Sequence, residues 1–187
     1  MRITSGQFKG IPVFAPPGMD VRPTLARTRQ AVFNMLRPYI NGAAVVDIFS
    51  GTGALGFEAI SNGAAFAYFL DVSHGEYIAK NAAKLKLDGS AYRFIKGDFL
   101  KGLYALEALN VKADIIFADP PYNRGFIRKL LDAGALSSIL NDGGLLVAEI
   151  HYQEKMEIEA RLNGWVILKE KEYGETWVVL FKKPEVI

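Results

Sequence analysis

The chain has 187 residues, 50% of them hydrophobic and 22% charged, so it is long and apolar enough to bury a core without disulfides or a structural metal. The absence of cysteine excludes thiolate nucleophiles, iron–sulfur clusters and cysteine-ligated zinc. The two histidines, His74 and His151, are too few for a histidine-rich metal site, and we expect them at the surface or at helix ends. Without a long apolar segment, we expect no membrane span and a cytoplasmic location.

The net charge of +2 is distributed unevenly. Residues 1–40 carry six basic side chains and one acid, whereas the other 147 residues carry sixteen basic and nineteen acidic side chains. Four of these basic residues are arginines between positions 22 and 37, and the planar guanidinium group suits phosphate oxygens. The pattern predicts local contact with a nucleic acid, although a solvated helix face would produce the same pattern.

The amino-terminal residues predict an arm followed by a helix. Residues 3–15 alternate loosely between polar and apolar side chains and lead into Pro16-Pro17-Gly18, which is typical of a short hairpin or arm closed by a turn. Apolar residues then recur at helical spacing as far as Ile40, with Thr24 expected as the N-cap and Asn41-Gly42 as the end. We therefore expect an amino-terminal extension over residues 1–41 and a larger domain over residues 42–187.

Beyond Gly42, short apolar strands alternate with amphipathic helices. The expected strands cover residues 43–49, 66–72, 92–96, 113–118 and 144–150, and the expected helices cover residues 54–61, 75–87, 100–109, 126–140 and 154–162. Continuously apolar strands are typical of parallel strands covered on both faces. Residues 165–169 and 176–182 follow without a helix between them, so the last strand should run antiparallel near the sheet edge. The sequence predicts an α/β fold with a doubly wound, mostly parallel, seven-stranded Rossmann-like sheet.

A glycine-rich turn follows the first expected strand. Three glycines satisfy the pattern G-x-G-x-x-G of nucleotide-binding loops: Gly51, Gly53 and Gly56. Asp47, Asp71 and Asp98 come at the carboxyl ends of the first three strands, where carboxylates disfavour a pyrophosphate and favour a cationic ligand. S-adenosylmethionine fits this pattern, because its ammonium and sulfonium groups are positive and its hydroxyl and amino groups donate hydrogen bonds. A helix cap or a loop would explain any one of the acids alone.

The tetrad Asp119-Pro120-Pro121-Tyr122 follows the fourth expected strand. Its two prolines fix two φ angles and remove two backbone donors, so the Asp119 side chain and the Pro120 carbonyl remain as acceptors. Acceptors fixed in this way can hold an exocyclic amino group of a base and direct its lone pair toward a methyl donor. Tyr122 could stack on that base, which contributes about 1–3 kcal/mol. A rigid turn with no role in catalysis is the alternative.

These motifs, in this order, resemble the amino-methylating class I S-adenosylmethionine-dependent methyltransferases. The amino-terminal residues are similar to a narrower family, the bacterial RsmD-like small-subunit (16S) rRNA guanine-N2 methyltransferases. The residues that carry this second resemblance are Arg2-Ile3, Gly6-Gln7-Phe8-Lys9-Gly10, Arg22-Pro23-Thr24, Arg27, Arg29 and Phe33-Asn34-Met35-Leu36. The resemblance covers nearly the whole chain, but the carboxyl-terminal hairpin lacks the strongly basic rim that RNA contact by that end would require.

The resemblance implies a set of functional residues. Catalysis and the target base would involve Asp119, Pro120, Pro121 and Tyr122. S-adenosylmethionine, which becomes S-adenosylhomocysteine, would contact Asp47, Phe49, Gly51, Gly53, Asp71, Val72, Asp98 and Phe99. RNA would contact Arg22, Thr24, Arg27 and Arg29 of an RNA-contacting extension. The partner would be 16S rRNA or an assembling small ribosomal subunit, and the enzyme would be a monomer that needs no metal and no membrane.

The chemistry of the bases favours guanine N2 as the target. An ionised Asp119 can accept both N1–H and the 2-amino group of guanine, whereas adenine presents an acceptor N1 beside its amino group. Three alternatives stay open: a DNA or other nucleic-acid amino methyltransferase acting on N6 of adenine or N4 of cytosine, a nicotinamide-dependent oxidoreductase, and a non-catalytic RNA-binding module. The first would need room for a target-recognition domain, and the second has no use for the tetrad.

Four other residues are conspicuous by their type. Each can be explained by a helix face, a cap or packing in the sheet, and we therefore expect no catalytic role for them: Glu58, Asn81, Glu149 and Trp177.

Overall fold

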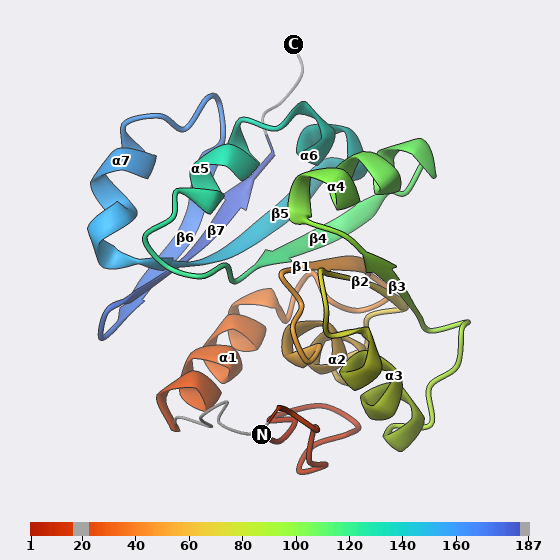
Figure 1. Ribbon diagram of the computed structural model, residues 1–187. Helices are drawn as coiled ribbons and strands as arrows, with labels where there is room; N and C mark the ends of the chain where they lie inside the picture. Colours follow the sequence, from red (N-terminus) through yellow and green to blue (C-terminus); the bar gives the residue numbers. More distant parts are fainter. Residues whose placement is uncertain (17–22, 184–187) are drawn as a thin grey trace.

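The computed structural model describes residues 1–16 and 23–183, which fold around one seven-stranded sheet (Figure 1). The strands are β1 (Ala44–Ile48), β2 (Phe66–Asp71), β3 (Tyr92–Lys96), β4 (Ala113–Ala118), β5 (Leu140–His151), β6 (Val166–Tyr173) and β7 (Thr176–Lys182). The helices are α1 (Pro23–Leu36), α2 (Ala54–Ser61), α3 (Gly75–Lys84), α4 (Phe99–Ala108), α5 (Phe126–Leu131), α6 (Gly134–Ile139), the 3-10 turn η1 (Tyr152–Glu154) and α7 (Lys155–Glu159). None of the helices in these two ranges could span a lipid bilayer.

The strand order is β3-β2-β1-β4-β5-β7-β6. Strands β1 to β5 are parallel to one another, and β7 runs antiparallel to both of its neighbours, β5 and β6. This confirms the expected doubly wound sheet with an antiparallel carboxyl-terminal strand. Because the connections from β1 and β4 lead toward opposite edges, the crevice beyond the carboxyl ends of these two strands is where an open α/β sheet binds its ligand.

Helices cover both faces of the sheet. Helices α1, α2 and α3 lie on one face, and α4 to α7 lie on the other (Figure 1). Alternate residues of β1 point to opposite sides, so that Val45 belongs to the core under α1–α3 and Val46 to the core under α4–α7. The central strands β1 and β4 are buried on both faces, which explains why they are mostly apolar.

The amino-terminal arm packs on the first of these cores. Ile3 and Val13 are buried in the same cluster as Val45 of β1 and Phe57 of α2, so residues of the expected extension and of the expected larger domain share one core. The expected hairpin has one antiparallel bridge, Arg2 with Pro12, flanked by hydrogen bonds from the Ile3 N–H to Ile11 and from the Val13 N–H to Met1, and between its two sides the backbone N–H groups of residues 4, 5, 7 and 8 donate to α2.

The expected bounds of α1 are wrong at both ends. The helix begins at Pro23, since a proline at the first position has no N–H to satisfy, and Thr24 therefore lies inside the helix and is not its N-cap. The helix ends at Leu36, and Tyr39 and Ile40 form a turn by donating to the Leu36 carbonyl. The expected turn at Pro16-Pro17-Gly18 continues beyond the described residues.

The carboxyl-terminal half also departs from the expected pattern. The helix expected over residues 126–140 is interrupted because Ala133 is extended (φ −78°, ψ 115°) and separates α5 from α6. Strand β5 begins at Leu140 and not at Gly144, since Leu140 pairs with Ala113 before a shift in register. The helix expected over residues 154–162 is shortened to α7, and the chain turns at Asn163 with a φ of 48°.

Candidate active site

The glycine-rich turn connects β1 to α2 and uses its glycines for two purposes. Gly51 and Gly53 adopt left-handed backbone conformations, with φ of 52° and 83°, which favour glycine. A Cβ on Gly56 would lie 2.2 Å from Cε1 of Phe69, so this position must be glycine for α2 to approach β2. Phe49, which precedes the turn, also has a positive φ of 64°. Strain at a non-glycine residue beside a ligand-binding turn is typical of a functional site.

Asp47 lies beneath this turn and not on its open side. Its side chain is 2% exposed and its Oδ2 accepts a hydrogen bond of 2.9 Å from the Gly56 N–H. The pKa of Asp47 is raised to about 8, chiefly by burial, against the lowering effect of the Gly56 hydrogen bond and with a smaller contribution from the nearby Asp119 and Asp71. Asp47 therefore holds a proton near neutral pH when no cation is close, and a cationic ligand above the turn would favour its ionised form.

Asp71 is a carboxylate fixed at the end of β2. Its Oδ2 accepts a bond of 2.9 Å from the Gly51 N–H, and its Oδ1 accepts from the Ser73 and His74 N–H groups and contacts the His74 ring at 2.9 Å. Partial burial alone would raise the pKa of Asp71, but these bonds outweigh it and hold the pKa below its usual range. A charged acceptor is thus placed against the glycine turn.

An open pocket of about 220 Å³ lies beside Asp71, between the ends of β1, β2 and β3. Three aromatic rings form much of its wall, with centroid separations of 5.2–5.5 Å: Phe49, Phe99 and Phe126. Val72, Pro121 and Asp98 also line the pocket. Asp98 is also the N-cap of α4, and its pKa is lowered by the hydrogen bond from the Lys101 N–H. The pocket offers apolar faces for a flat ring and carboxylates for donors.

The proline-rich tetrad borders the same pocket through Pro121. Asp119, directly after β4, is exposed, and no described residue donates a hydrogen bond to its carboxylate. The surrounding protein partly desolvates it and raises its pKa to about 6. The hydroxyl of Tyr122 lies 3.0 Å from the Thr176 Oγ1, and its ring, 36% exposed, lies beside the imidazole of His151 at 5.5 Å. The tetrad thus has a free acceptor and an accessible ring.

The two histidines differ in environment. His74 precedes α3, as expected of a residue at a helix end. His151, at the end of β5, is only 8% exposed and is the N-cap of η1, where its Nδ1 accepts from the Gln153 N–H, so it too lies at a helix end. The ring of His151 lies between those of Tyr122 and Tyr152, which cover it.

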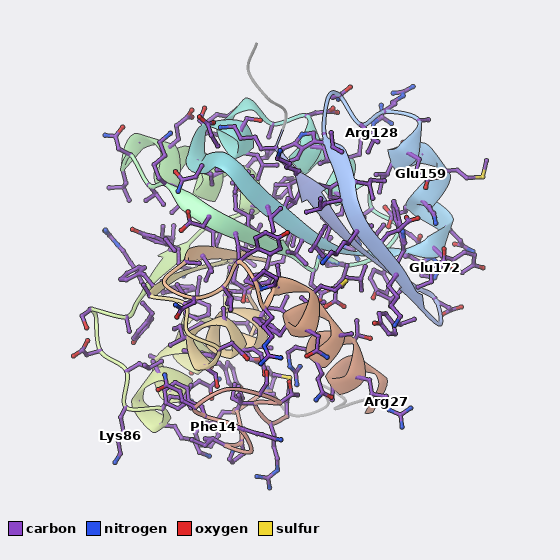
Figure 2. All side chains as sticks on the ribbon, turned by 180° about the vertical axis from the view of Figure 1, so that it is seen from behind. Phe14, Arg27, Lys86, Arg128, Glu159 and Glu172 are labelled. Carbon is purple, nitrogen blue, oxygen red and sulfur yellow. The ribbon has the colours of Figure 1, made fainter. Side chains whose placement is uncertain are left out.

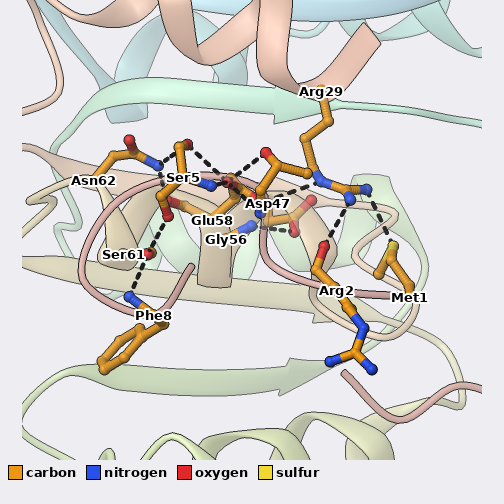
Figure 3. Close-up of polar contacts among 11 residues, drawn as sticks. Met1, Arg2, Ser5, Phe8, Arg29, Asp47, Gly56, Glu58, Ser61 and Asn62 are labelled. Atoms are coloured by element: carbon orange, nitrogen blue, oxygen red, sulfur yellow. Dashed lines mark hydrogen bonds and ion pairs between the residues drawn. The ribbon is translucent and has the colours of Figure 1, made fainter. Parts of the chain in front are cut away.

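Arg29 must be removed from the expected RNA-binding residues. Its side chain is buried, and its Nε lies 3.1 Å from Oε2 of Glu58 on α2. The other guanidinium nitrogens donate to the Arg2 carbonyl and to the Met1 sulfur (Figure 3). Glu58 also accepts bonds from Thr4 and Ser5, so this network attaches α1 and the arm to α2. A guanidinium group used in this way cannot contact phosphate.

The other residues of the basic segment lie in different environments. Arg27 is exposed and projects from α1 into solvent (Figure 2). Arg22 lies outside the described residues, and Thr24 lies within α1. Arg37, just after α1, is exposed as well. Arg27 and Arg37 therefore form the accessible part of the basic segment in the described chain.

Three residues that shape the site were not assigned to it from the sequence. Phe126 lines the pocket, although it comes after the tetrad and not from the strands that carry the expected cofactor residues. Glu154 accepts hydrogen bonds from the Asn123 and Gly125 N–H groups and so holds the loop that follows the tetrad. Asn81 joins Phe14 of the arm to the Thr52 carbonyl of the glycine turn. Each role depends on contacts between distant segments.

Comparisons with known proteins agree with this fold. Residues 1–182 match the family model described as Conserved hypothetical protein 95. Ribosomal RNA small subunit methyltransferase D of Escherichia coli (strain K12) is 31% identical over 189 residues, which cover 98% of this chain and 90% of that protein. The protein of the same name from Haemophilus influenzae is 30% identical and covers 93% and 89%. The solved structure of yhhF from Escherichia coli has a TM-score of 0.82 at 30% identity and covers 100% and 99%.

The sheet order, the glycine-rich turn and the adjoining pocket define a Rossmann-like α/β protein with the topology of the class I methyltransferases. More narrowly, the chain belongs to the family described as Conserved hypothetical protein 95. The similarity to the small-subunit rRNA methyltransferases D over nearly the full length confirms the family resemblance that the sequence motifs predicted.

Proposed function

We propose that this protein transfers a methyl group from S-adenosylmethionine to N2 of a guanine in 16S rRNA. One observation carries the proposal. Pro121 of the tetrad, which offers the free Asp119 acceptor, lines the same pocket as Phe49, which precedes the glycine turn. A methyl donor bound in that pocket and an amine held by Asp119 would therefore be neighbours. The relatives named as small-subunit rRNA methyltransferases support methylation of small-subunit rRNA, and the choice of guanine N2 rests on the chemistry of Asp119.

The residues of the pocket fit S-adenosylmethionine. The rings of Phe49, Phe99 and Phe126 offer apolar contacts for its adenine, and Asp98 is an acceptor for the adenine amino group. Asp71 is a fixed carboxylate for the ribose hydroxyls. When bound, the cofactor supplies an electrophilic methyl group on a sulfonium. A dinucleotide would instead bring a pyrophosphate toward carboxylates, which Coulomb repulsion disfavours.

Asp119 would hold the target amine and receive its proton. The ionised carboxylate accepts N1–H and one hydrogen of the 2-amino group, which directs the nitrogen lone pair toward the methyl donor. As the nitrogen gains the methyl group, positive charge develops on it, and the adjacent carboxylate stabilises that charge and accepts the proton. With a pKa of about 6, Asp119 is largely ionised at neutral pH and can later return the proton to solvent.

The base must leave its helix to reach this site, and Tyr122 can offset part of the cost by stacking on it. The exposed Arg27 and Arg37 would contact phosphates near the target. Such contacts position an RNA without reading its sequence, so recognition of the site would rest on the folded shape of the substrate.

Transfer of a labelled methyl group to naked 16S rRNA, to free small subunits and to DNA, followed by identification of the nucleoside, tests the proposal. We expect N2-methylguanosine in rRNA. Asp119→Ala should slow the transfer at least about 100-fold and leave the affinity for S-adenosylhomocysteine unchanged. Asp142→Ala is a matched control, because Asp142 is fully exposed at the opposite end of the sheet. Labelled N6-methyladenine, or binding of NADH in place of S-adenosylhomocysteine, would contradict the proposal.

A further inference from the structure

Glu149 places a second carboxyl group beside Asp119. The register pairs Ala118 of β4 with Ala148 of β5, so the next residues along the two strands, Asp119 and Glu149, are neighbours. Glu149 shares the face of its strand with Val147, which packs in the core under α1–α3. The electrostatic coupling of Glu149 to Asp119, Asp47 and Arg29 agrees with this placement.

The environment of Glu149 makes it a hydrogen-bond donor. Its side chain is 6% exposed, and no residue in the described ranges forms a hydrogen bond with its carboxyl group. Burial raises the pKa of Glu149 well above its usual range, and the neighbouring Asp119 and Asp47 act in the same direction, while Arg29 opposes them. Arg29 cannot neutralise Glu149 fully, because its guanidinium is bonded to Glu58. Of two adjacent carboxyls, the deeper one keeps the proton and the exposed Asp119 ionises.

The order of groups across the sheet matches the edge of a guanine. The glycine turn follows β1, Asp119 follows β4 and Glu149 lies in β5, and these three strands are consecutive in the sheet. Along the Watson–Crick edge of guanine, the 2-amino group, N1–H and O6 follow one another. When the 2-amino group points toward the methyl donor and N1–H donates to Asp119, the acceptor O6 points toward β5. Strands β4 and β5 are separated by about 4.8 Å, the usual spacing of paired strands.

We propose that Glu149 is a specificity-determining residue that donates a hydrogen bond to O6 of the target guanine. This inference rests on the proposed function and deepens it. Asp119 accepts the two donors of the guanine edge, and the protonated Glu149 supplies the one donor that O6 requires. An adenine directed with its amino group toward the methyl donor would present its N1 acceptor to the ionised Asp119 and a C–H to Glu149, leaving a buried donor unpaired.

Substrates that differ in the base separate this role from a structural one. The RNA site mapped in the methyl-transfer assay is prepared with guanosine or with 2,6-diaminopurine riboside, which keeps the 2-amino group but carries an amino donor in place of O6 and an acceptor N1 in place of N1–H. The change at N1 faces Asp119 and is the same for every variant, so the comparison between variants isolates the position of O6. The kcat/KM for both substrates is measured with the wild type, Glu149→Gln and Glu149→Ala. The affinity for S-adenosylhomocysteine and the unfolding midpoint show whether each variant is folded. A purely structural defect would slow both substrates by the same factor.

We expect Glu149→Gln, whose amide still donates, to retain kcat/KM for guanosine within about tenfold. Glu149→Ala should lower kcat/KM for guanosine by about 10- to 100-fold, the effect of leaving one polar group unpaired, and should lower the preference for guanosine over 2,6-diaminopurine. An unchanged preference in Glu149→Ala, or an equal loss in Glu149→Gln, would overturn the assignment of Glu149 alone. If the wild type does not methylate guanosine, the proposed function fails, and the inference fails with it.

Discussion

Replacement of Asp47 by asparagine tests whether the carboxyl beneath the glycine turn is protonated in the ligand-free protein. Asparagine can still accept the hydrogen bond from the Gly56 N–H, so the change removes the titration and keeps the contact. In the unfolded chain Asp47 ionises with a pKa of about 3.8, whereas in the folded protein its pKa is about 8. Between these values the folded state holds a proton that the unfolded state has lost.

The sign of the effect follows from this proton. Because the folded state binds more protons, the free energy of unfolding of the wild type falls as pH rises, by about 1.4 kcal/mol per pH unit. Asp47→Asn lacks this contribution. From pH 5 to pH 7 the difference in free energy of unfolding between the variant and the wild type should therefore shift by about 2.7 kcal/mol in favour of the variant.

Urea denaturation at pH 5, 6 and 7 measures this shift. Asp119 and Glu149 also have raised pKa values, but they are present in both proteins and largely cancel in the difference. A difference that stays constant over this range would show that Asp47 is already ionised in the folded protein. The proposed attraction between Asp47 and a cationic ligand would then need no change of protonation.

Glu58→Ala leaves the buried guanidinium of Arg29 without its carboxylate, so the free energy of unfolding, measured in urea, should fall by about 3–5 kcal/mol. The exposed control Glu76→Ala should lower it by less than about 1 kcal/mol, and equal losses would refute the structural role of the network. Arg27→Ala should reduce the slope of log affinity for RNA against log salt by up to about 0.9 with cofactor affinity unchanged, and an unaltered slope would remove Arg27 from the interface. Phe126→Ala should weaken S-adenosylhomocysteine about tenfold in calorimetry, and unchanged affinity would exclude its ring from the cofactor contacts.

Local sequence patterns were sufficient to predict the sheet and the positions of the main motifs. Apolar strands followed by amphipathic helices define the βαβ units, and the glycines and prolines impose the turns that carry the site. The interruption at Ala133 was missed, because apolar residues continue at helical spacing on both sides of it. Boundaries of this kind are decided by packing against neighbouring elements.

The roles of charged side chains were harder to predict, because they depend on contacts between distant segments. Arg29 and Arg27 lie in the same basic segment, yet one is buried against Glu58 and the other is exposed. Glu149 was expected to be a packing residue. Its position beside Asp119 follows only from the register of β4 against β5, which no local pattern contains.

Mass spectrometry that resolves each modified position of small-subunit rRNA tests the central claim most directly. RNA is compared from a strain with the gene, from a strain without it, and from the latter supplied with the wild-type gene or with Asp119→Ala. We expect one N2-methylguanosine to disappear with the gene, to return with the wild type and to stay absent with Asp119→Ala. Unchanged guanine methylation together with the loss of an N6-methyladenosine would contradict the assignment of the target base and of the site built around Asp119.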